Sequence, residues 1–256
     1  MRIFSLLFIL IFSFSAQARV FDFSGESLAA YFHTTGGLSK IGDLAYSNSS
    51  GASTVFTDTV PYHPGFELGF LFGIGGAMVV KAGAELIQTK QLTAISGKNA
   101  SGTELFTLSS RVFAFNPNLT FEFNISQDKT SRFFFALSAG WSIIDMDNDY
   151  TFSATGKSEL SVAADYIEKS QATMITYGSY IGYEILAVDN VTFLMNVGYR
   201  HIPVSQFEYK NDYADLIGSL QKTKGEAVVN NDGSIRSMDF GGPFVGLGFR
   251  FYINFM

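Results

Sequence analysis

The sequence predicts an all-β fold: a transmembrane antiparallel up-and-down β-barrel of eight strands. Three observations predict this class. Apolar residues recur at every second position in eight separate segments, which is the period of a strand with one apolar face. The alternate face of these segments carries mostly Gly, Ser, Thr and Asn, small residues that suit a crowded barrel interior. The connections alternate long and short, as in membrane barrels with long outer loops and short inner turns.

The composition is consistent with strands that face lipid. Of the 256 residues, 47% are apolar and only 16% are charged, and the chain holds 27 Phe and 25 Gly. The absence of cysteine excludes disulfides, thiolate catalysis and cysteine-based metal sites. A net charge of −6 without a basic run argues against nucleic acid as a partner.

Residues 1–18 are predicted to be a cleaved signal peptide, which leaves residues 19–256 as one barrel domain. A basic start at Arg2 precedes an apolar run over residues 3–14 and an A-x-A cleavage motif at residues 16–18. This run is too short for a membrane anchor. The apolar stretch at residues 68–80 is also too short and too rich in glycine for a spanning helix, so a closed barrel is the remaining way to cross lipid.

Eight strands are predicted in chain order. They cover about residues 20–33, 59–72, 77–92, 104–126, 132–146, 171–187, 191–202 and 245–255. The first has the weakest alternation, with Phe21, Phe23, Ala29 and Tyr31 on one face.

The second to fourth strands alternate more clearly. Apolar residues occupy every second position over residues 66–72, 78–86 and 119–125. In the fourth strand this pattern is broken at Asn116-Pro117-Asn118. Because proline cannot donate to a ladder, we expect a bulge or bend there.

The fifth to eighth strands follow the same rule, with alternation over residues 133–143, 175–185, 191–199 and 245–255. Between the strands, short turns fall at residues 73–76, 127–131 and 188–190, and long loops at 34–58, 93–103, 147–170 and 203–237. Residues 213–220 in the last loop are expected to form a short turn of helix or strand.

Aromatic residues are expected to form a girdle at each membrane interface. The inner girdle would contain Phe70, Phe72, Phe121, Phe123, Phe133, Phe135, Tyr183, Phe193, Phe251 and Phe255, and the outer girdle Tyr31, Phe66, Trp141, Tyr177 and Tyr199. The competing fold is a soluble barrel of the lipocalin kind, whose water-facing side would be richly charged, whereas the alternate face here carries few charges.

The last strand resembles the C-terminal signal strand of bacterial outer-membrane barrels. The apolar face of that strand is formed by Leu247, Phe249, Phe251, Ile253 and Phe255. That family usually ends on the aromatic residue itself, and Met256 is a departure from its pattern. The resemblance implies an integral protein of the Gram-negative-type cell outer membrane that is inserted by the outer-membrane assembly machinery.

The alternation directs eight charged residues toward the barrel interior: Glu26, Glu67, Lys81, Glu85, Glu122, Glu184, Arg200 and Arg250. Eight strands leave an interior that side chains fill. Charges in such a space must pair or change protonation. They are therefore expected either to form a structural ion-pair network or to line a polar path for ions or small solutes.

The three histidines are candidates for a metal site or a catalytic site. His33 and His63 are expected near the rim, where two imidazoles could share a metal, but no third ligand has a fixed spacing. His201, Ser205 and Glu208 offer a base, a nucleophile and an orienting acid. Some eight-stranded outer-membrane lipid A deacylases carry a His-x-Ser-Asn run, which this sequence lacks. Asp145, Asp147 and Asp149 alternate like calcium ligands without the required glycine and distal glutamate.

Over the mature chain, the pattern is similar to the small barrels of the OmpA-membrane-domain, OmpX and OmpW type. This resemblance implies a non-enzymatic protein: structural, surface-binding, or a narrow channel for small or hydrophobic molecules. No cofactor is expected, the chain is expected to be a monomer, and its partners would be outer-membrane lipids or lipopolysaccharide and the assembly machinery. The alternative is a lipid-modifying hydrolase that uses His201.

Overall fold

A computed structural model describes residues 21–40, 44–47, 53–56, 59–88, 95–217, 220–229 and 234–253. The predicted signal peptide and Phe255 of the predicted signal strand lie outside these residues. Within the described part of the chain, no helix is long and apolar enough to cross a membrane.

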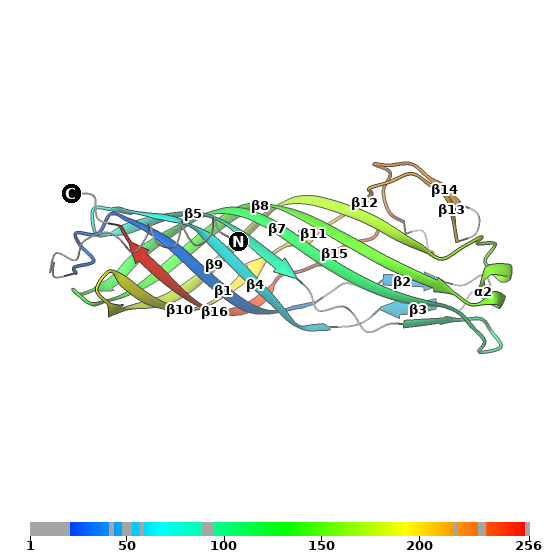
Figure 1. The fold of residues 1–256 in the computed structure, drawn as a ribbon, viewed down its shortest axis with the longest axis horizontal. Coiled ribbons are helices and arrows are strands. Elements are labelled where there is room, and N and C mark those ends of the chain that lie inside the picture. The colour runs from blue at the N-terminus through cyan, green and yellow to red at the C-terminus, as the bar shows by residue number, and fades with distance from the viewer. Residues whose placement is uncertain are drawn as a thin grey trace, which may run out of the picture.

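Eight long strands form one antiparallel ring (Figure 1). They are β1 (Leu28–Lys40), β4 (Thr59–Ile74), β5 (Met78–Gln88), β7 (Glu104–Gln127), β8 (Ser131–Phe152), β9 (Tyr166–Val188), β10 (Val191–His201) and β16 (Gly242–Tyr252). Each pairs with the next in this order, and β16 pairs with β1 to close the ring. The prediction of an eight-stranded antiparallel barrel is confirmed.

Several short elements lie at the end of the barrel from which β7, β8 and β9 project. The helix α2 (Ala154–Glu159) joins β8 to β9 at the tip (Figure 1). The paired segments are β2 (Leu44–Ser47) with β3 (Ser53–Phe56), β6 (Ile95–Lys98) with β7, β11 (Pro203–Val204) with β15 (Met238–Asp239), β12 (Glu208–Tyr209) with β9, and β13 (Tyr213–Leu216) with β14 (Leu220–Lys222). The expected short element within residues 213–220 is thus a strand.

The start of the first strand was predicted wrongly. β1 begins at Leu28 rather than near residue 20, and it continues to Lys40 into the predicted loop. Phe21 and Phe23 precede it in a turn and are buried. Tyr31 is also buried, because the register of β1 points odd-numbered residues inward, so it does not belong to the outer aromatic girdle.

Pro117 does not produce the expected bulge. Phe115 pairs with Ile143 and Asn118 pairs with Gly140 in one unbroken register, so the ladder to β8 is interrupted but no extra residue is inserted. The irregularity in β7 lies instead between Asn124 and Ser126, close to the short turn.

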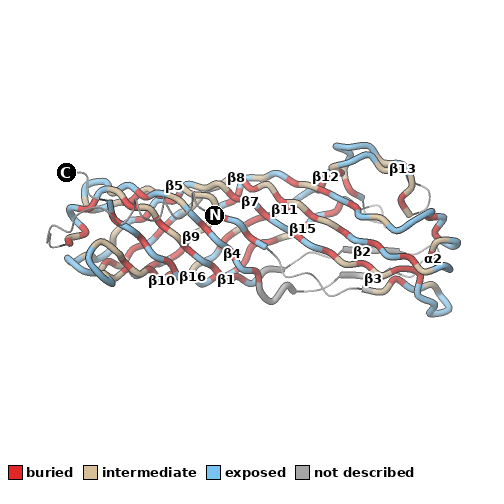
Figure 2. Tube along the Cα trace, viewed as in Figure 1, coloured by how far each residue is buried: buried red, intermediate tan, exposed pale blue. Residues whose placement is uncertain are grey.

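Both ends of the predicted loop at residues 147–170 are strand, because the alternation changes its phase along β8. In the lower part of β8 apolar residues such as Leu137 and Trp141 face outward and are exposed. Farther up, Met146 and Tyr150 face inward and are buried, while Asp147 faces outward. Buried and exposed positions continue to alternate along the projecting strands (Figure 2). A strand that leaves lipid and enters water must exchange its apolar and polar faces in this way.

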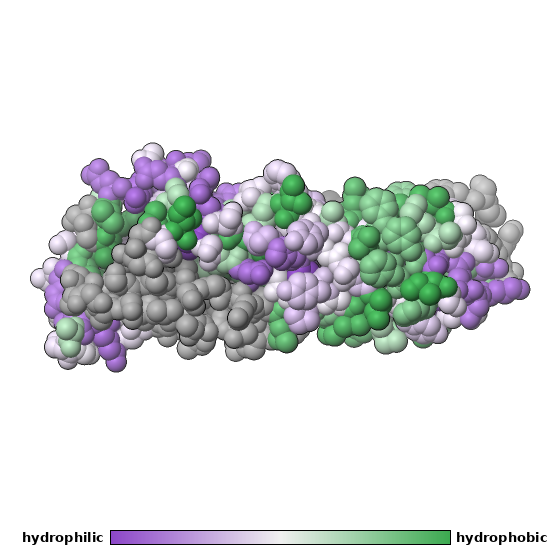
Figure 3. Space-filling model, turned by 180° about the vertical axis from the view of Figure 1, so that it is seen from behind, coloured by the Kyte–Doolittle hydropathy of each residue, from purple (hydrophilic) through white to green (hydrophobic). Residues whose placement is uncertain are grey.

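The outward apolar surface has the height of a membrane core. On β7 it runs from Ile125 to Phe113, and both side chains are exposed. At about 3.3 Å per residue and a strand tilt of about 40°, this stretch rises roughly 30 Å, the thickness of a bilayer hydrocarbon core. Figure 3 shows the larger hydrophobic area over the barrel end of the molecule. We call this surface the apolar belt.

Candidate functional site

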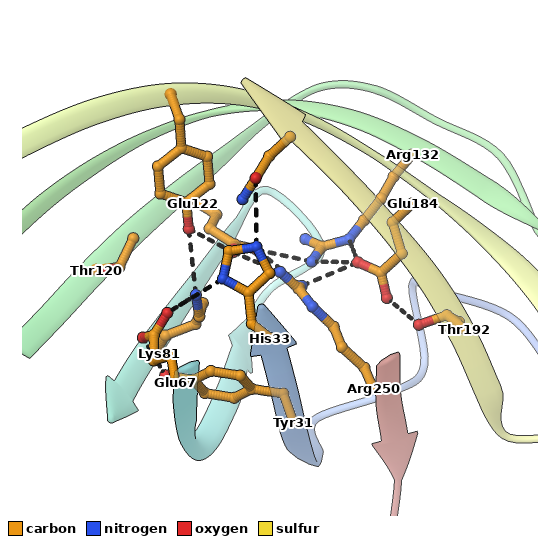
Figure 4. Close-up of polar contacts among 12 residues, drawn as sticks. Tyr31, His33, Glu67, Lys81, Thr120, Glu122, Arg132, Glu184, Thr192 and Arg250 are labelled. Atoms are coloured by element: carbon orange, nitrogen blue, oxygen red, sulfur yellow. Dashed lines mark hydrogen bonds and ion pairs between the residues drawn. The ribbon is translucent and has the colours of Figure 1, made fainter. Parts of the chain in front are cut away.

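Two arginines and two glutamates form a buried, charge-balanced layer across the barrel (Figure 4). Arg250 donates from Nη1 and Nη2 to the two carboxylate oxygens of Glu122, at 2.9 and 2.6 Å. Arg132 donates from Nη2 to Glu122 at 2.8 Å and from Nε to Glu184 at 2.7 Å. Arg250 Nη1 also lies 2.9 Å from Glu184, and Tyr252 donates its hydroxyl to the same carboxylate at 2.9 Å. We call Glu122, Arg132, Glu184 and Arg250 the charged layer.

A second polar group lies next to the charged layer. Glu67 accepts a hydrogen bond from the Tyr31 hydroxyl at 2.6 Å and lies 3.7 Å from Lys81 Nζ. The Lys81 ammonium also donates to the Tyr180 hydroxyl at 3.3 Å and sits 4.4 Å from the centre of the Tyr31 ring. On the other side of Glu67, His33 Nδ1 approaches the carboxylate to 3.4 Å (Figure 4). One buried carboxylate therefore faces one buried ammonium, which again leaves little net charge.

A third polar group lines a small cavity. Arg200 donates to Glu85 at 2.7 Å and to Thr35 at 2.9 Å, and Thr35 donates to Glu85 at 3.1 Å. Asn116 accepts from Thr176 at 3.0 Å on the opposite wall. The cavity between them measures about 50 Å³. That is room for a few water molecules and not for an organic solute.

Apolar clusters cover both ends of the polar interior. At the short-turn end, Phe21 and Phe23 pack edge-to-face with ring centres 4.9 Å apart, and Phe21 meets Tyr252 at 5.2 Å. At the other end, inward residues of the projecting strands pack against described residues of the segment 202–240 in one buried cluster. It includes Leu108, Val112, Ile144, Met146, Tyr150, Ile202, Val204, Phe207 and Phe240. We call this second cluster the outer cap.

The outer cap contains one buried polar hub. Arg236 forms an ion pair with Glu168 of β9. Glu168 also accepts a hydrogen bond from Asn148 at 2.9 Å, and Asn148 accepts one from Ser110 at 2.6 Å. Because an unpaired charge in this place would be costly, the hub fixes residues 234–240 against all three projecting strands.

Tyr213 holds the β13–β14 hairpin against the edge of the projecting sheet. Its hydroxyl accepts from the backbone N–H of Lys169 at 2.5 Å and donates to the carbonyl of Ile167 at 3.2 Å. Burial raises the pKa of Tyr213 above its usual value, so the phenol keeps the proton that it donates. Beside the pairing with β12, the edge of β9 at Ile167 and Lys169 is thus satisfied by a side chain.

The structure buries all eight residues that the alternation directs inward. Seven of them join the three polar groups described above, while Glu26 lies in the segment before β1. The sequence reasoning missed Arg132, a member of the charged layer, although its position one residue before outward-facing Phe133 carries the needed signal. A function of these inward charged residues as a site remains a prediction.

The two rim histidines do not form a shared metal site. Both are buried inside rather than placed at the rim. His33 pairs in register with Glu67, and His63 pairs with Gly37, four residues farther along β1. That separation is about 13 Å along the strand, too far for one metal ion. Among the described residues, no group of three His, Asp or Glu could hold a metal.

The three aspartates of β8 are also dispersed. Asp145 pairs with Lys210 at 2.9 Å, and Asp147 and Asp149 follow it on the outward face of the strand. They are successive outward positions rather than one cluster.

The candidate catalytic residues are not assembled. The His201 ring lies against Tyr177, with ring centres 4.7 Å apart. Ser205 is exposed, and Glu208 lies in β12 opposite Gln171. In the described part of the chain, no hydrogen bond joins His201 to either of the others.

The predicted signal strand presents its apolar face to the outside. Leu247, Phe249, Phe251 and Ile253 are exposed, the first three on β16. Recognition of this strand by an assembly machinery remains a prediction.

Comparisons with known proteins give structural similarities only. No protein-family model matches the sequence, and no curated protein matches it either. The structure is similar to Neisserial surface protein A, with 13% identity over 88% of this chain and 97% of the other and a TM-score of 0.37. It is similar to Ail, the attachment invasion locus protein of Yersinia pestis, with 12% identity over 88% and 99% and a TM-score of 0.37. It is also similar to the outer membrane protein OprG of Pseudomonas aeruginosa, with 15% identity over 90% and 99% and a TM-score of 0.40.

These similarities are low in identity and in TM-score, and three features of the chain itself identify its fold. They are the closed ring of eight antiparallel strands, the apolar belt of bilayer height and the polar, self-neutralised interior. The chain is an eight-stranded antiparallel barrel whose outward surface is that of a membrane-spanning barrel.

Proposed function

We propose that this protein is a non-enzymatic outer-membrane barrel with a closed interior, and that it acts at the cell surface through its projecting sheet. The observation that carries the proposal is the charged layer. Its four side chains are buried and form ion pairs with one another, so a solute could pass only if these ion pairs separated. Leaving one member of a buried pair without its partner costs about 3–5 kcal/mol.

The apolar clusters at the two ends of the barrel also support a closed interior. A solute that enters from the short-turn side meets Phe21 and Phe23, and one that enters from the projecting side meets the outer cap. The cavity of about 50 Å³ is the space that remains near the middle. A narrow channel for small or hydrophobic molecules would need all three barriers to move.

The projecting sheet has the properties of a binding platform. Its inner face is fixed by the outer cap, and the outward residues Asp149 and Thr151 near its tip are exposed. Binding residues commonly lie on exposed segments that a rigid scaffold holds in place. We therefore place the function on the outward residues of β7, β8 and β9 beyond the apolar belt.

Single-channel recording tests the closed interior. The protein purified from membranes is added to a planar bilayer, and we expect insertion without conductance steps. Steps in the wild type that change in Glu67→Gln or Arg200→Gln would contradict the proposal, because these residues would then line a path.

Adhesion of cells that display the protein tests the platform. We expect displaying cells to bind a coated surface better than non-displaying cells, and Asp149→Ala with Thr151→Ala to reduce that binding. Lys129→Ala, at the opposite end of the barrel, is the matched control. Equal adhesion with and without the protein would contradict a surface-binding role. Release of acyl chains from lipid A that is lost in His201→Ala would instead support the hydrolase alternative.

A further inference from the structure

The outer wall of the barrel carries a groove of about 730 Å³ in the upper part of the apolar belt. It forms where Gly36 supplies no side chain to the outward face of β1. In register with Gly36, Pro64 stands on one side and Val245 on the other. Outward apolar residues line the rest, among them Phe66, Leu86, Phe113, Met195 and Leu247.

The position of the groove decides what fills it. Phe66, Leu86 and Phe113 are exposed members of the apolar belt, so the groove opens toward hydrocarbon. An empty depression there would forfeit dispersion contacts on one side. A flexible acyl chain can follow such a groove, and its volume lies within the range of about 300–1,000 Å³ found for small-molecule sites.

A free cation stands directly above the groove. Arg111 is the next outward residue above Phe113 on β7, about 5 Å higher for a tilted strand. Its side chain is exposed and makes no ion pair with any described residue. Its neighbour across β8 is Asp147, whose own neighbour across β9 is Lys169. The row of three therefore keeps one net positive charge at the level where lipid head groups lie.

We propose that this groove binds one anionic membrane lipid, with an acyl chain along Gly36 and a phosphate on Arg111. A guanidinium suits phosphate because it offers several donors in a plane. Gln88 ends β5 at the upper rim of the groove and adds an amide beside the head group. The same chemistry is present in phospholipids and in lipid A, so both are tested.

Native mass spectrometry of the protein purified from membranes measures retained lipid. The probes are phosphatidylglycerol, lipid A, and phosphatidylcholine with the same chains as the phosphatidylglycerol. We expect the wild type to retain the two anionic lipids in preference to phosphatidylcholine. Gly36→Leu should abolish retention of all three, whereas Ala30→Leu, lower on the outward face of β1, should change nothing.

The cation is tested separately. Arg111→Gln should reduce the preference for anionic lipids roughly five-fold, the effect of one basic residue at an anionic surface. Lys129→Gln, in a short turn at the opposite end of the barrel, should leave the preference unchanged. If Gly36→Leu does not accumulate in membranes, Val245→Phe fills the groove from the next strand. Retention that neither filling variant reduces would overturn the site, and retention without charge preference would overturn the assignment of an anionic lipid. Neither result depends on the surface-binding role proposed above.

Discussion

Removal of Arg250 should destabilise the barrel more than removal of Arg250 and Glu122 together. Arg250 is fully buried and makes two hydrogen bonds to Glu122 and an ion pair with Glu184. Arg250→Met leaves two buried carboxylates with only Arg132 as an ion-pair partner, at an expected cost of about 3–5 kcal/mol. Adding Glu122→Leu leaves Arg132 paired with Glu184 at 2.7 Å and restores charge balance. The double variant should therefore recover part of the loss.

Urea unfolding of the purified protein in lipid measures this difference. The chain has one tryptophan, Trp141, which lies exposed in the apolar belt, so its fluorescence reports loss of the membrane environment. Lys129→Met, an exposed charge in a short turn, is the control and should change the free energy of unfolding by less than about 0.5 kcal/mol. If the two core substitutions prove additive, or the double variant is less stable than Arg250→Met, the charge-balance reasoning is wrong.

Three further predictions concern packing, pH and the outer cap. Gly83→Val should lower stability by about 1–3 kcal/mol in the same assay, because a Cβ there would lie 2.0 Å from the Tyr31 hydroxyl; an unchanged unfolding midpoint would contradict it. The backbone N–H of Phe152 and the ammonium of Lys157 lower the pKa of Asp165. The contribution of Asp165 to stability is therefore present above the ordinary carboxyl pKa and is lost as pH falls through the lowered pKa. Protection of the Phe152 amide against hydrogen exchange, relative to its intrinsic rate at each pH, should fall at low pH in the wild type and be low at all pH values in Asp165→Ala. Arg236→Met should make residues 203–240 sensitive to limited proteolysis while the barrel resists cleavage. Equal cleavage of the wild type and Arg236→Met would show that the buried hub does not hold this segment in place.

Within lipid, the pattern of side chains was sufficient to predict the barrel. The period of two predicted the strands, and the small residues on the other face predicted which face lines the barrel interior. The short turns predicted which strands are neighbours, since antiparallel strands joined by a tight turn must pair. Arg250 and Glu122 could be placed inward on that basis. Their partnership could not, because the two residues lie far apart in the chain and meet only when the ring closes.

The first strand shows why alternation alone was insufficient. Phe21 and Phe23 share the spacing of a strand, yet they cover the barrel mouth from a turn. Nothing local distinguishes an apolar side chain that faces lipid from one that closes an opening. Only the length of β1, fixed by its pairing with β4 and β16, separates the two.

The segment at residues 112–115 of β7 marks where the chain leaves the membrane. Val112 and Ala114 face inward and are buried in the outer cap, while Phe113 and Phe115 face outward in the apolar belt. Both faces are apolar here, because the belt and the cap overlap at this height. Such a run lacks alternation and reads as ambiguous in the sequence. The run marks a height in the barrel. Below residues 112–115, polar groups must be neutralised in the barrel interior, whereas above them polar groups can face water. Arg111 is the first outward residue beyond the run, and this is why a cation can stay free there when the arginines of the charged layer cannot.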